Sequence, residues 1–397
     1  MTGQETSVEE SLEKERYDRQ LRVSGWRQEL LQKATVLIAG VGALGCEISK
    51  NLALMGVGKL ILVDNDVVEL SNLSRQILFR DQDIGRSKSQ AAAEKIREMN
   101  RYVEVKPVEG DLRRIPLEYY EEASVICACV DNWPTRRWLN STAVETGKPL
   151  VDVAMEGVYA NVQDIIPGKT PCIECHGEEL IPREVQAAEC TLRRRRPEDL
   201  AQDLKEQGIT VTLQEAEELF KAGIKTIFDI KYSPLGGLLK LNPSGGELIQ
   251  RIRELLRPKM PALQSVAAAI SGIATMEIIK ILHRGSLGKP YSGLIIYDAL
   301  ASRVTRVPLS RNKECFVCGE YARGEEATLT MEKDTTVLQL KEVIAQRYMY
   351  PDPEVQYKTK ILKDDVKLGQ LTADDELMLF IHTSRRLNPL TIKVKLI

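Results

Sequence analysis

The segment ATVLIAGVGALGCEISKNLALMGVGKLILVD (34–64) constrains the fold of this chain more than any other. A β-branched run ends on glycine, and the residues after it place apolar side chains on one helix face, at Leu44, Ile48 and Leu52. KLILVD then reads as a second strand. Strand, glycine turn, helix and strand form a βαβ unit, whose right-handed crossover requires a parallel sheet covered on both faces. The sequence therefore predicts a doubly wound, Rossmann-like α/β domain.

Changes in the predicted pattern of helices and strands indicate the domain boundaries. The alternation of strands and helices runs through 1–171, and charged helical sequence at 172–260 indicates a helical insertion. Residues 261–325 are predicted to complete the first domain, because they contain an apolar helix at 268–282 and the strand SGLIIYDAL. The last part, 326–397, combines short strands with one amphipathic helix, whose inward residues are Val337, Leu340, Val343 and Ile344. This pattern is typical of a β-grasp, ubiquitin-like module.

Composition narrows the classes of partner. A net charge of -2 over 397 residues gives no global attraction for nucleic acid or an anionic membrane, so we expect neither as a partner. The N-terminal stretch MTGQETSVEESLEKER lacks the apolar core of a signal peptide, and polar residues interrupt the apolar stretch SVAAAISGIATMEIIKIL. We therefore expect a cytoplasmic protein without a membrane span.

The glycine loop predicts a nucleotide site. Gly40, Gly42 and Gly45 suit a tight turn, close approach to phosphate and close helix packing, and the helix that begins near Ala43 offers N–H donors to an anion. Asp64 lies 19 residues beyond Gly45, where a carboxylate can hold ribose hydroxyls. By itself, this pattern also fits a nicotinamide-dependent oxidoreductase.

The polar stretch after the second strand favours a triphosphate over a hydride carrier. Arg75 and Lys88 supply cations, while Asn72 and Gln76 supply amides. The alternative is a solvated polar loop. Farther on, Asp131 ends the apolar run SVICACV, where it would either hold Mg²⁺ against ATP phosphates or cap the helix predicted at 134–146.

Two CxxC pairs predict a structural metal site. Cys172 and Cys175 form the first pair, and Cys315 and Cys318 form the second. Four thiolates at this spacing fit tetrahedral zinc. Because 139 residues separate the pairs, the ion would cross-link distant parts of the chain. The alternative is a set of buried or redox-active thiols.

The other cysteines divide into two kinds. Three lie in apolar helix or strand sequence, where small buried side chains are expected: Cys46, Cys127 and Cys129. Cys190 instead precedes four arginines in AAECTLRRRR, and such a cationic setting lowers a thiol pKa and favours a reactive thiolate. The alternative is an incidental exposed cysteine. None of the three histidines is placed as its partner, so a Cys–His hydrolase is not supported.

Over nearly its whole length, the chain resembles the ubiquitin-like-modifier-activating enzymes, close to their catalytic subunits. The matching motifs are RYDRQ, GVGALG, DNDVVELSNLSRQILF, DIGRSKS, VDNWPTRRWLN, both CxxC pairs and ECTL. The resemblance implies that an adenylation domain uses MgATP to adenylate the C-terminal Gly-Gly end of a small modifier. A catalytic cysteine in the insertion then takes the modifier as a thioester.

The resemblance also implies residue roles. It places Asp64 on ribose, Asp131 on Mg²⁺ and Cys190 as the thioester nucleophile. The phosphate-side and remaining nucleotide-contacting residues are then Asn72, Arg75, Lys88, Gln76, Asn132 and the glycine loop. After the CT pair the sequence has LRRRRPEDL, with the family's proline but without its His-Cys pair.

Partners follow from the same resemblance. Arg19 in RYDRQ resembles the arginine that reaches the ATP of the other subunit, and since this chain also holds the cysteine, we expect a symmetric homodimer. The ubiquitin-fold domain, 326–397, would recruit a conjugating enzyme. Competing hypotheses are a sulfur-carrier-protein adenylyltransferase and a non-catalytic scaffold.

Overall fold

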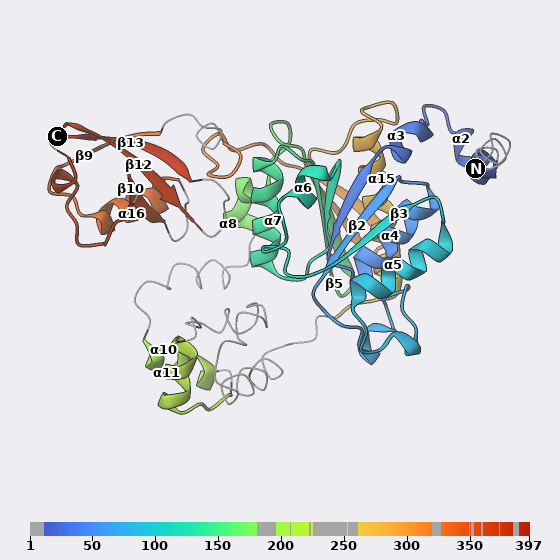
Figure 1. Cartoon of the computed structure of the whole chain (residues 1–397), viewed down its shortest axis with the longest axis horizontal. Coiled ribbons are helices and arrows are strands. Elements are labelled where there is room, and N and C mark those ends of the chain that lie inside the picture. Colours follow the sequence, from blue (N-terminus) through green and yellow to red (C-terminus); the bar gives the residue numbers. More distant parts are fainter. Residues whose placement is uncertain are drawn as a thin grey trace. The chain divides into compact units, whose positions relative to one another are not determined.

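The computed structural model describes 12–180, 196–206, 208–221, 224, 252, 261–319, 327–348, 350, 353–358, 360–372, 374–383 and 389–397 (Figure 1). Cys190 lies outside the described residues. The chain divides into two compact units. The first comprises 1–131, 135–175 and 261–313, and the second comprises 132–134, 176–260 and 314–397.

Eight strands of the described residues form one sheet in the first unit, in the order β3-β2-β1-β4-β5-β6-β7-β8. The parallel strands are β1 (Thr35–Ala39), β2 (Lys59–Asp64), β3 (Glu104–Glu109), β4 (Val125–Ala128) and β5 (Leu150–Glu156). The antiparallel strands are β6 (Tyr159–Ile165), β7 (Gly293–Asp298) and β8 (Arg303–Pro308). Because β1 pairs with both β2 and β4, the strand order reverses there, and a ligand crevice is expected at the carboxyl ends of these strands.

Helices of the first unit accompany this sheet. The long ones are α4 (Ala43–Leu54), α5 (Lys88–Met99), α7 (Trp133–Glu145) and α15 (Gln264–Leu282), and the short ones are α2 (Asp18–Leu21), α3 (Gln28–Gln32) and α6 (Glu118–Glu122). Single 3₁₀ turns are η1 (Leu70–Asn72), η2 (Asp81–Asp83) and η3 (Ile173–His176). Helix α8 (Gly177–Leu180), which follows η3, belongs to the second unit. The predicted doubly wound α/β domain is confirmed.

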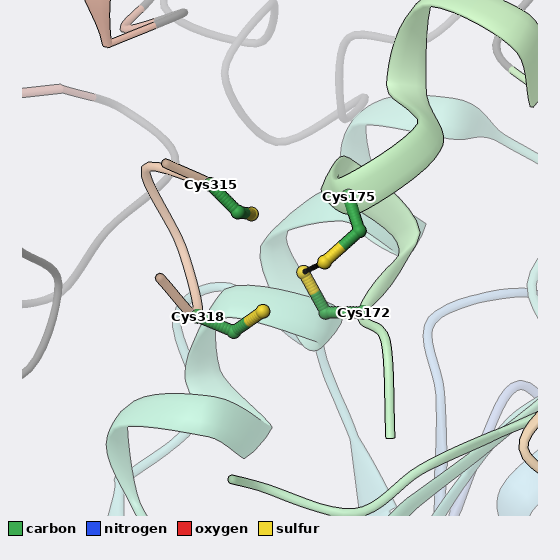
Figure 2. A group of neighbouring side chains, drawn as sticks. All are labelled: Cys172, Cys175, Cys315 and Cys318. Carbon is green, nitrogen blue, oxygen red and sulfur yellow. Dashed lines mark hydrogen bonds between the residues drawn. The ribbon is translucent and has the colours of Figure 1, made fainter. Parts of the chain in front are cut away.

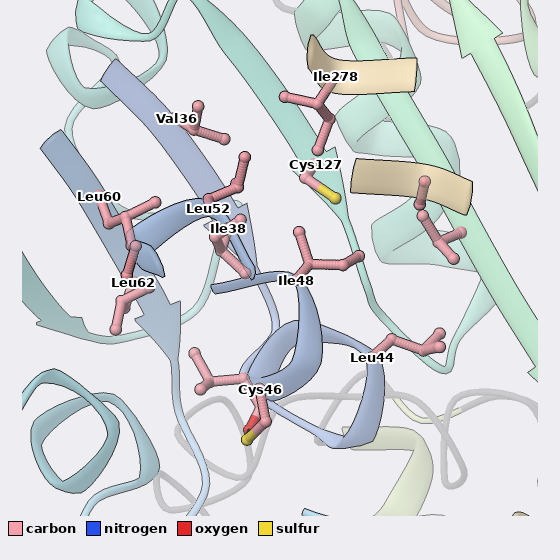
Figure 3. Close-up of a cluster of buried hydrophobic side chains, with 14 of the residues drawn as sticks. Val36, Ile38, Leu44, Cys46, Ile48, Leu52, Leu60, Leu62, Cys127 and Ile278 are labelled. Carbon is pink, nitrogen blue, oxygen red and sulfur yellow. The ribbon is translucent and has the colours of Figure 1, made fainter. Parts of the chain in front are cut away.

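The core of the first unit lies between the sheet and its helices. Ile48 and Leu52 of α4 are fully buried and lie beside Ile38 of β1 (Figure 3). Each such side chain contributes about 1.5–3 kcal/mol through burial. This packing explains why the sequences of β1 and β2 are almost continuously apolar, because a parallel strand is covered on both faces.

Helix α15 completes this core. It begins at Gln264, four residues before the predicted start at 268. By length and composition it would be able to cross a membrane. However, it packs against α4, β5 and β6, and residues such as Ile270 and Ile278 are fully buried against them. Its apolar character is therefore explained by its place in the core.

Two carboxyl groups meet in this core. Asp164 of β6 and Glu277 of α15 are 1% and 2% exposed. The Tyr291 N–H donates to Oδ2 of Asp164 at 3.1 Å and to Oε2 of Glu277 at 3.2 Å. Burial, followed by the neighbouring Glu277 carboxyl, raises the pKa of Asp164 to about 9. The folded protein therefore keeps Asp164 protonated at neutral pH.

This pair predicts a pH dependence of stability. The unfolded chain releases the Asp164 proton near pH 3.9, so the stabilisation is complete below that pH and is lost as pH rises towards about 9. Asp164→Asn is expected to remove this slope, which is at most about 1.4 kcal/mol per pH unit. Urea unfolding between about pH 6 and 9 measures it. Equal slopes in wild type and variant would contradict the prediction.

The second unit contains a β-grasp sheet. Its described strands have the order β11-β10-β12-β13-β9, with β13 parallel to β9. They are β9 (Ala327–Met331), β10 (Glu354–Tyr357), β11 (Lys360–Ile361), β12 (Glu376–His382) and β13 (Leu390–Leu396), joined by α16 (Val337–Arg347) and the turn η5 (Leu368–Gln370). Val337, Leu340 and Ile344 of α16 are fully buried, as expected, whereas Val343 is half-buried. The predicted module is confirmed.

Besides α8, the insertion contributes the described helices α10 (Pro197–Glu206) and α11 (Leu213–Lys221) to the second unit. Leu200 and Leu204 of α10 pack with Leu219 of α11 in a small hydrophobic cluster. This agrees with the helical character predicted for the insertion.

Candidate nucleotide site and cysteine cluster

The glycine loop follows β1 and requires its first and last glycines. Gly40 has a φ of +91°, and a Cβ there would lie 2.9 Å from the carbonyl oxygen of Cys129. A Cβ on Gly45 would lie 2.0 Å from the carbonyl oxygen of Gly40. Neither position accepts a side chain, because the loop packs directly on the end of β4 and the first turn of α4 packs directly on the loop.

Gly42 has open space beside it. Among the described residues, the atom nearest to a Cβ built there is Nε2 of Gln76, at 4.0 Å. Gly42 is also the N-cap of α4, which begins at Ala43, and without a side chain it leaves the first N–H groups of the helix for another acceptor. This part of the loop fits an anionic phosphate.

Asp64 holds a carboxylate at the edge of the loop. It is 9% exposed, its Oδ2 accepts the Val41 N–H at 2.6 Å, and its Oδ1 accepts the Asp66 N–H at 2.8 Å. Burial raises its pKa, and the Lys88 cation opposes that rise. Each carboxylate oxygen keeps a lone pair, so the group remains able to accept from ribose hydroxyls.

Amide and guanidinium groups follow on η1 and the residues after it. Oδ1 of Asn72 accepts the Glu69 N–H at 3.1 Å, and Nη1 of Arg75 donates to the Ser71 carbonyl at 2.8 Å. Gln76 is 4% exposed, and its Oε1 has no hydrogen-bond partner among the described residues. A buried amide oxygen without a partner costs about 1–3 kcal/mol, which a bound donor would offset.

Lys88 begins α5 and is a buried cation of this region. It is 7% exposed, and its Nζ donates to Oδ2 of Asp66 at 2.9 Å. Burial opposes the charge, yet nearby carboxylates raise the Lys88 pKa above its ordinary value, so the side chain stays cationic. These carboxylates belong to Asp64, Asp66 and Asp131.

Asp131 is exposed beyond the end of β4, and the half-buried Asn132 follows it. The turn is held by Arg136, which donates to the Val130 carbonyl at 2.6 Å and to Oδ2 of Asp152 at 2.8 Å. The carboxyl ends of β1, β2 and β4 thus carry the loop, Asp64 and Asp131, respectively. An exposed carboxylate in this place fits a hard cation such as Mg²⁺.

The four CxxC cysteines come together. Their Sγ atoms lie within 4.8 Å of one another, and all four residues are buried (Figure 2). Sulfurs bound to one tetrahedral zinc at about 2.3 Å are about 3.8 Å apart, so the cluster fits this ion with small adjustments. A buried ion pair between Arg137 of α7 and Glu174 supports the first CxxC pair. The expectation that distant pairs meet is confirmed.

Arg19 lies far from the loop of its own chain. Its neighbour Gln20 donates to the Met55 carbonyl at 2.8 Å, so α2 is anchored at the C-terminal end of α4. The glycine loop is at the N-terminal end, and a helix of 12 residues spans about 18 Å. This distance exceeds the reach of an arginine side chain, and Arg19 itself is exposed.

Sequence reasoning missed some residues of this site. Asp66, which binds Lys88, was visible only as a second aspartate in DNDVV. Arg136 had no signal, because its contacts with Val130 and Asp152 depend on the fold. Cys46 and Cys127 are buried as expected, but Cys129 is half-buried, because it lies past the end of β4.

Comparison with known proteins identifies the family. The model of the ThiF family matches residues 17–317, and the model of the Ubiquitin family matches 320–386. The chain therefore belongs to the ThiF family and carries a ubiquitin-fold domain.

Individual relatives agree with this assignment. The chain is 29% identical over 344 residues to the "NEDD8-activating enzyme E1 catalytic subunit" of Arabidopsis thaliana, covering 79% of this chain and 72% of that protein. The corresponding Drosophila melanogaster protein is 38% identical over 178 residues, which cover 41% of this chain and 39% of the relative. A crystal structure of E. coli MccB with MccA-N7isoASN has a TM-score of 0.51 at 20% identity, covering 74% of this chain and 69% of MccB. This last likeness shows the fold alone.

Proposed function

We propose that this enzyme activates a ubiquitin-like protein modifier with ATP. The glycine loop, Asp64 and Asp131 follow the carboxyl ends of β1, β2 and β4, the pKa of the buried Lys88 responds to both aspartates, and this ThiF-family chain also bears a ubiquitin-fold domain. The similarity to NEDD8-activating enzymes makes a modifier, rather than a small metabolite, the substrate.

The first reaction is adenylation. A carboxylate oxygen of the C-terminal glycine attacks the α-phosphorus of ATP, pyrophosphate leaves, and a mixed anhydride forms. Lys88 and Arg75 would stabilise the negative charge on the phosphates, Asn72 and Gln76 would donate to them, and Asp64 would hold the ribose. Asp131, with Asn132 beside it, would hold Mg²⁺, which neutralises phosphate charge when bound.

The second reaction is thioester formation. The sulfur of Cys190 attacks the anhydride carbonyl, a thioester bond forms, and AMP leaves with the bonding electrons. The modifier then passes to a conjugating enzyme recruited by 326–397. Sulfur-carrier adenylation is less well supported, because it assigns no role to the ubiquitin-fold domain. The hypothesis of a nicotinamide-dependent oxidoreductase is not supported, because the match to the ThiF family and the phosphate-binding cations both favour adenylation.

ATP–pyrophosphate exchange tests the adenylation step. Exchange that requires both MgATP and a candidate modifier ending in Gly-Gly is the expected result. Exchange that occurs at the same rate with a modifier lacking the two terminal glycines would contradict the proposed substrate.

A symmetric homodimer explains the position of Arg19. Since Arg19 cannot reach the loop of its own chain, its proposed place is the nucleotide site of a second copy. Arg19→Ala and Asp131→Ala are each expected to abolish exchange. Co-expression of the two variants is expected to restore about a quarter of wild-type exchange, because half the dimers are mixed and each contains one intact site. Absence of recovery in verified mixed dimers would contradict action across the dimer.

The outer face of the β-grasp sheet is the proposed surface for the conjugating enzyme. Leu377 and Leu379 of β12 face the core, so the alternating Met378, which is 37% exposed, faces outward beside Lys393. Met378→Asp is expected to slow transfer about tenfold while leaving thioester formation unchanged. Gln346→Asp, on the exposed side of α16, is the matched control. Equal transfer rates for both variants would place the partner elsewhere.

A further inference from the structure

We propose that Cys127 and Cys129 form an oxidation-sensitive thiol pair that controls ATP binding. Their Sγ atoms are 3.7 Å apart. Cys127 lies in β4, at the centre of the sheet, where it pairs with Ile38 of β1 and Val151 of β5. Neither cysteine belongs to the zinc-type cluster, and neither has a role in adenylation or thioester formation.

Cys129 connects the pair to the glycine loop through its backbone. Its N–H donates to the Ala39 carbonyl at 2.8 Å, immediately before the loop. Its carbonyl oxygen lies 2.9 Å from the position of a Cβ on Gly40, so the two peptide groups are packed without a gap. Asp131 is two residues farther along. A displacement of Cys129 therefore displaces the backbone groups on which the glycine loop packs.

The two thiols differ in access. Cys127 is fully buried, and its contact with Cys129, together with burial, raises the pKa of its thiol. Cys129 is half-buried and is therefore the thiol that meets a small oxidant first.

Hydrogen peroxide is the oxidant that fits this access. The Cys129 sulfur attacks one peroxide oxygen, which forms a sulfenic acid and releases one water. The Cys127 sulfur then attacks the Cys129 sulfur, an S–S bond forms, and the hydroxyl leaves as a second water. Two thiols together lose two electrons and two protons, and one peroxide is reduced to two waters.

Disulfide formation requires the backbone to move. The sulfurs must close from 3.7 Å to about 2.05 Å. Residues two apart in a strand have Cα atoms about 6.6 Å apart, at the upper end of the range that a disulfide spans. Neighbouring strands hold Cys127 on both sides, whereas Cys129 lies beyond β4. Cys129 is therefore the residue that moves, away from Ala39 and Gly40.

The expected consequence is weaker nucleotide binding, and this inference rests on the proposed binding of ATP. Loss of the Cys129–Ala39 hydrogen bond and of the packing on Gly40 is expected to weaken ATP binding about tenfold. Reduction of the disulfide restores the bond and the affinity.

The test uses the full chain with Cys190→Ala, so that oxidation of the catalytic candidate has no effect. Protein treated with hydrogen peroxide and then with catalase is analysed by peptide mass spectrometry, zinc content and the dissociation constant for ATP. We expect a Cys127–Cys129 disulfide, an unchanged zinc content and about tenfold weaker ATP binding, reversed by dithiothreitol. Cys127→Ala and Cys127→Val, each in the same background, are expected to bind ATP as before and to keep that affinity after peroxide.

Several outcomes would overturn the inference. These are no disulfide under conditions that oxidise Cys129, unchanged ATP affinity in protein that contains the disulfide, or an equal loss of affinity in the Cys127 variants. Failure of the untreated protein to bind ATP would instead overturn the proposed function, and the inference with it. The two failures are thus distinguishable.

Discussion

Lys88→Met is expected to slow ATP–pyrophosphate exchange by about 100- to 1,000-fold. Lys88 is a buried cation whose Nζ binds Asp66 and whose pKa the carboxylates of Asp64, Asp66 and Asp131 raise, so its charge is already in place before phosphate arrives. Such a preorganised charge stabilises the negative charge that develops as pyrophosphate leaves. Methionine keeps the unbranched shape and most of the length of the side chain and removes the charge, so the loss reports mainly on electrostatics.

Stability and a matched variant control this experiment. Asp66, which pairs with Lys88, has a side chain that is 59% exposed, so water solvates it when the lysine is removed. The melting temperature is therefore expected to change by only a few degrees. Lys95→Met alters another lysine of α5, whose partner Glu98 is largely exposed, and exchange is expected to remain near wild type. A reduction below about threefold in Lys88→Met would contradict the role of this cation.

Cys315→Ser is expected to remove the bound metal and to lower the free energy of unfolding on the order of 5 kcal/mol. The four thiols lie together and are buried, so a serine at 315 removes one of the four ligands that a tetrahedral zinc ion requires. Zinc analysis of the purified chain is expected to give one ion per wild-type chain and none in the variant. Denaturant unfolding of the same samples measures the stability change.

Cys46→Ala is the control for the zinc prediction. Cys46 is fully buried in α4 and lies outside the cluster, so this variant makes a small cavity and keeps its zinc. Wild-type protein that contains no metal, or a Cys315→Ser variant that retains one ion per chain, would contradict a four-cysteine zinc site.

Much of the fold was predictable because its signals are local. The glycine at 45 is required by its contact with Gly40 within one βαβ unit, and the inward residues of α16 follow from helical periodicity. The meeting of the two CxxC pairs was also predictable, because thiolates at this spacing have a specific ligand chemistry. In each case, the residue pattern that gives the signal lies within a few residues of sequence.

Features that depend on long-range packing were not predictable. The contact of Lys88 with Asp66 and the hydrogen bond of Arg136 to Val130 are set by how distant elements meet. The separation of Arg19 from its own loop has the same cause, and only the family resemblance of RYDRQ implied it. The half-buried state of Cys129 depends on where β4 ends, and strand ends are poorly marked in apolar sequence. These are also the features on which the proposals about charge, dimerisation and oxidation depend.

Cys190 is proposed to carry the activated modifier as a thioester. The direct measurement is a non-reducing gel of the chain with MgATP and a candidate modifier ending in Gly-Gly, with and without dithiothreitol, for wild type and Cys190→Ala. A shifted band that dithiothreitol removes, and that Cys190→Ala lacks, is the predicted result. ATP–pyrophosphate exchange without such a band in either protein would contradict the claim and favour sulfur-carrier adenylation.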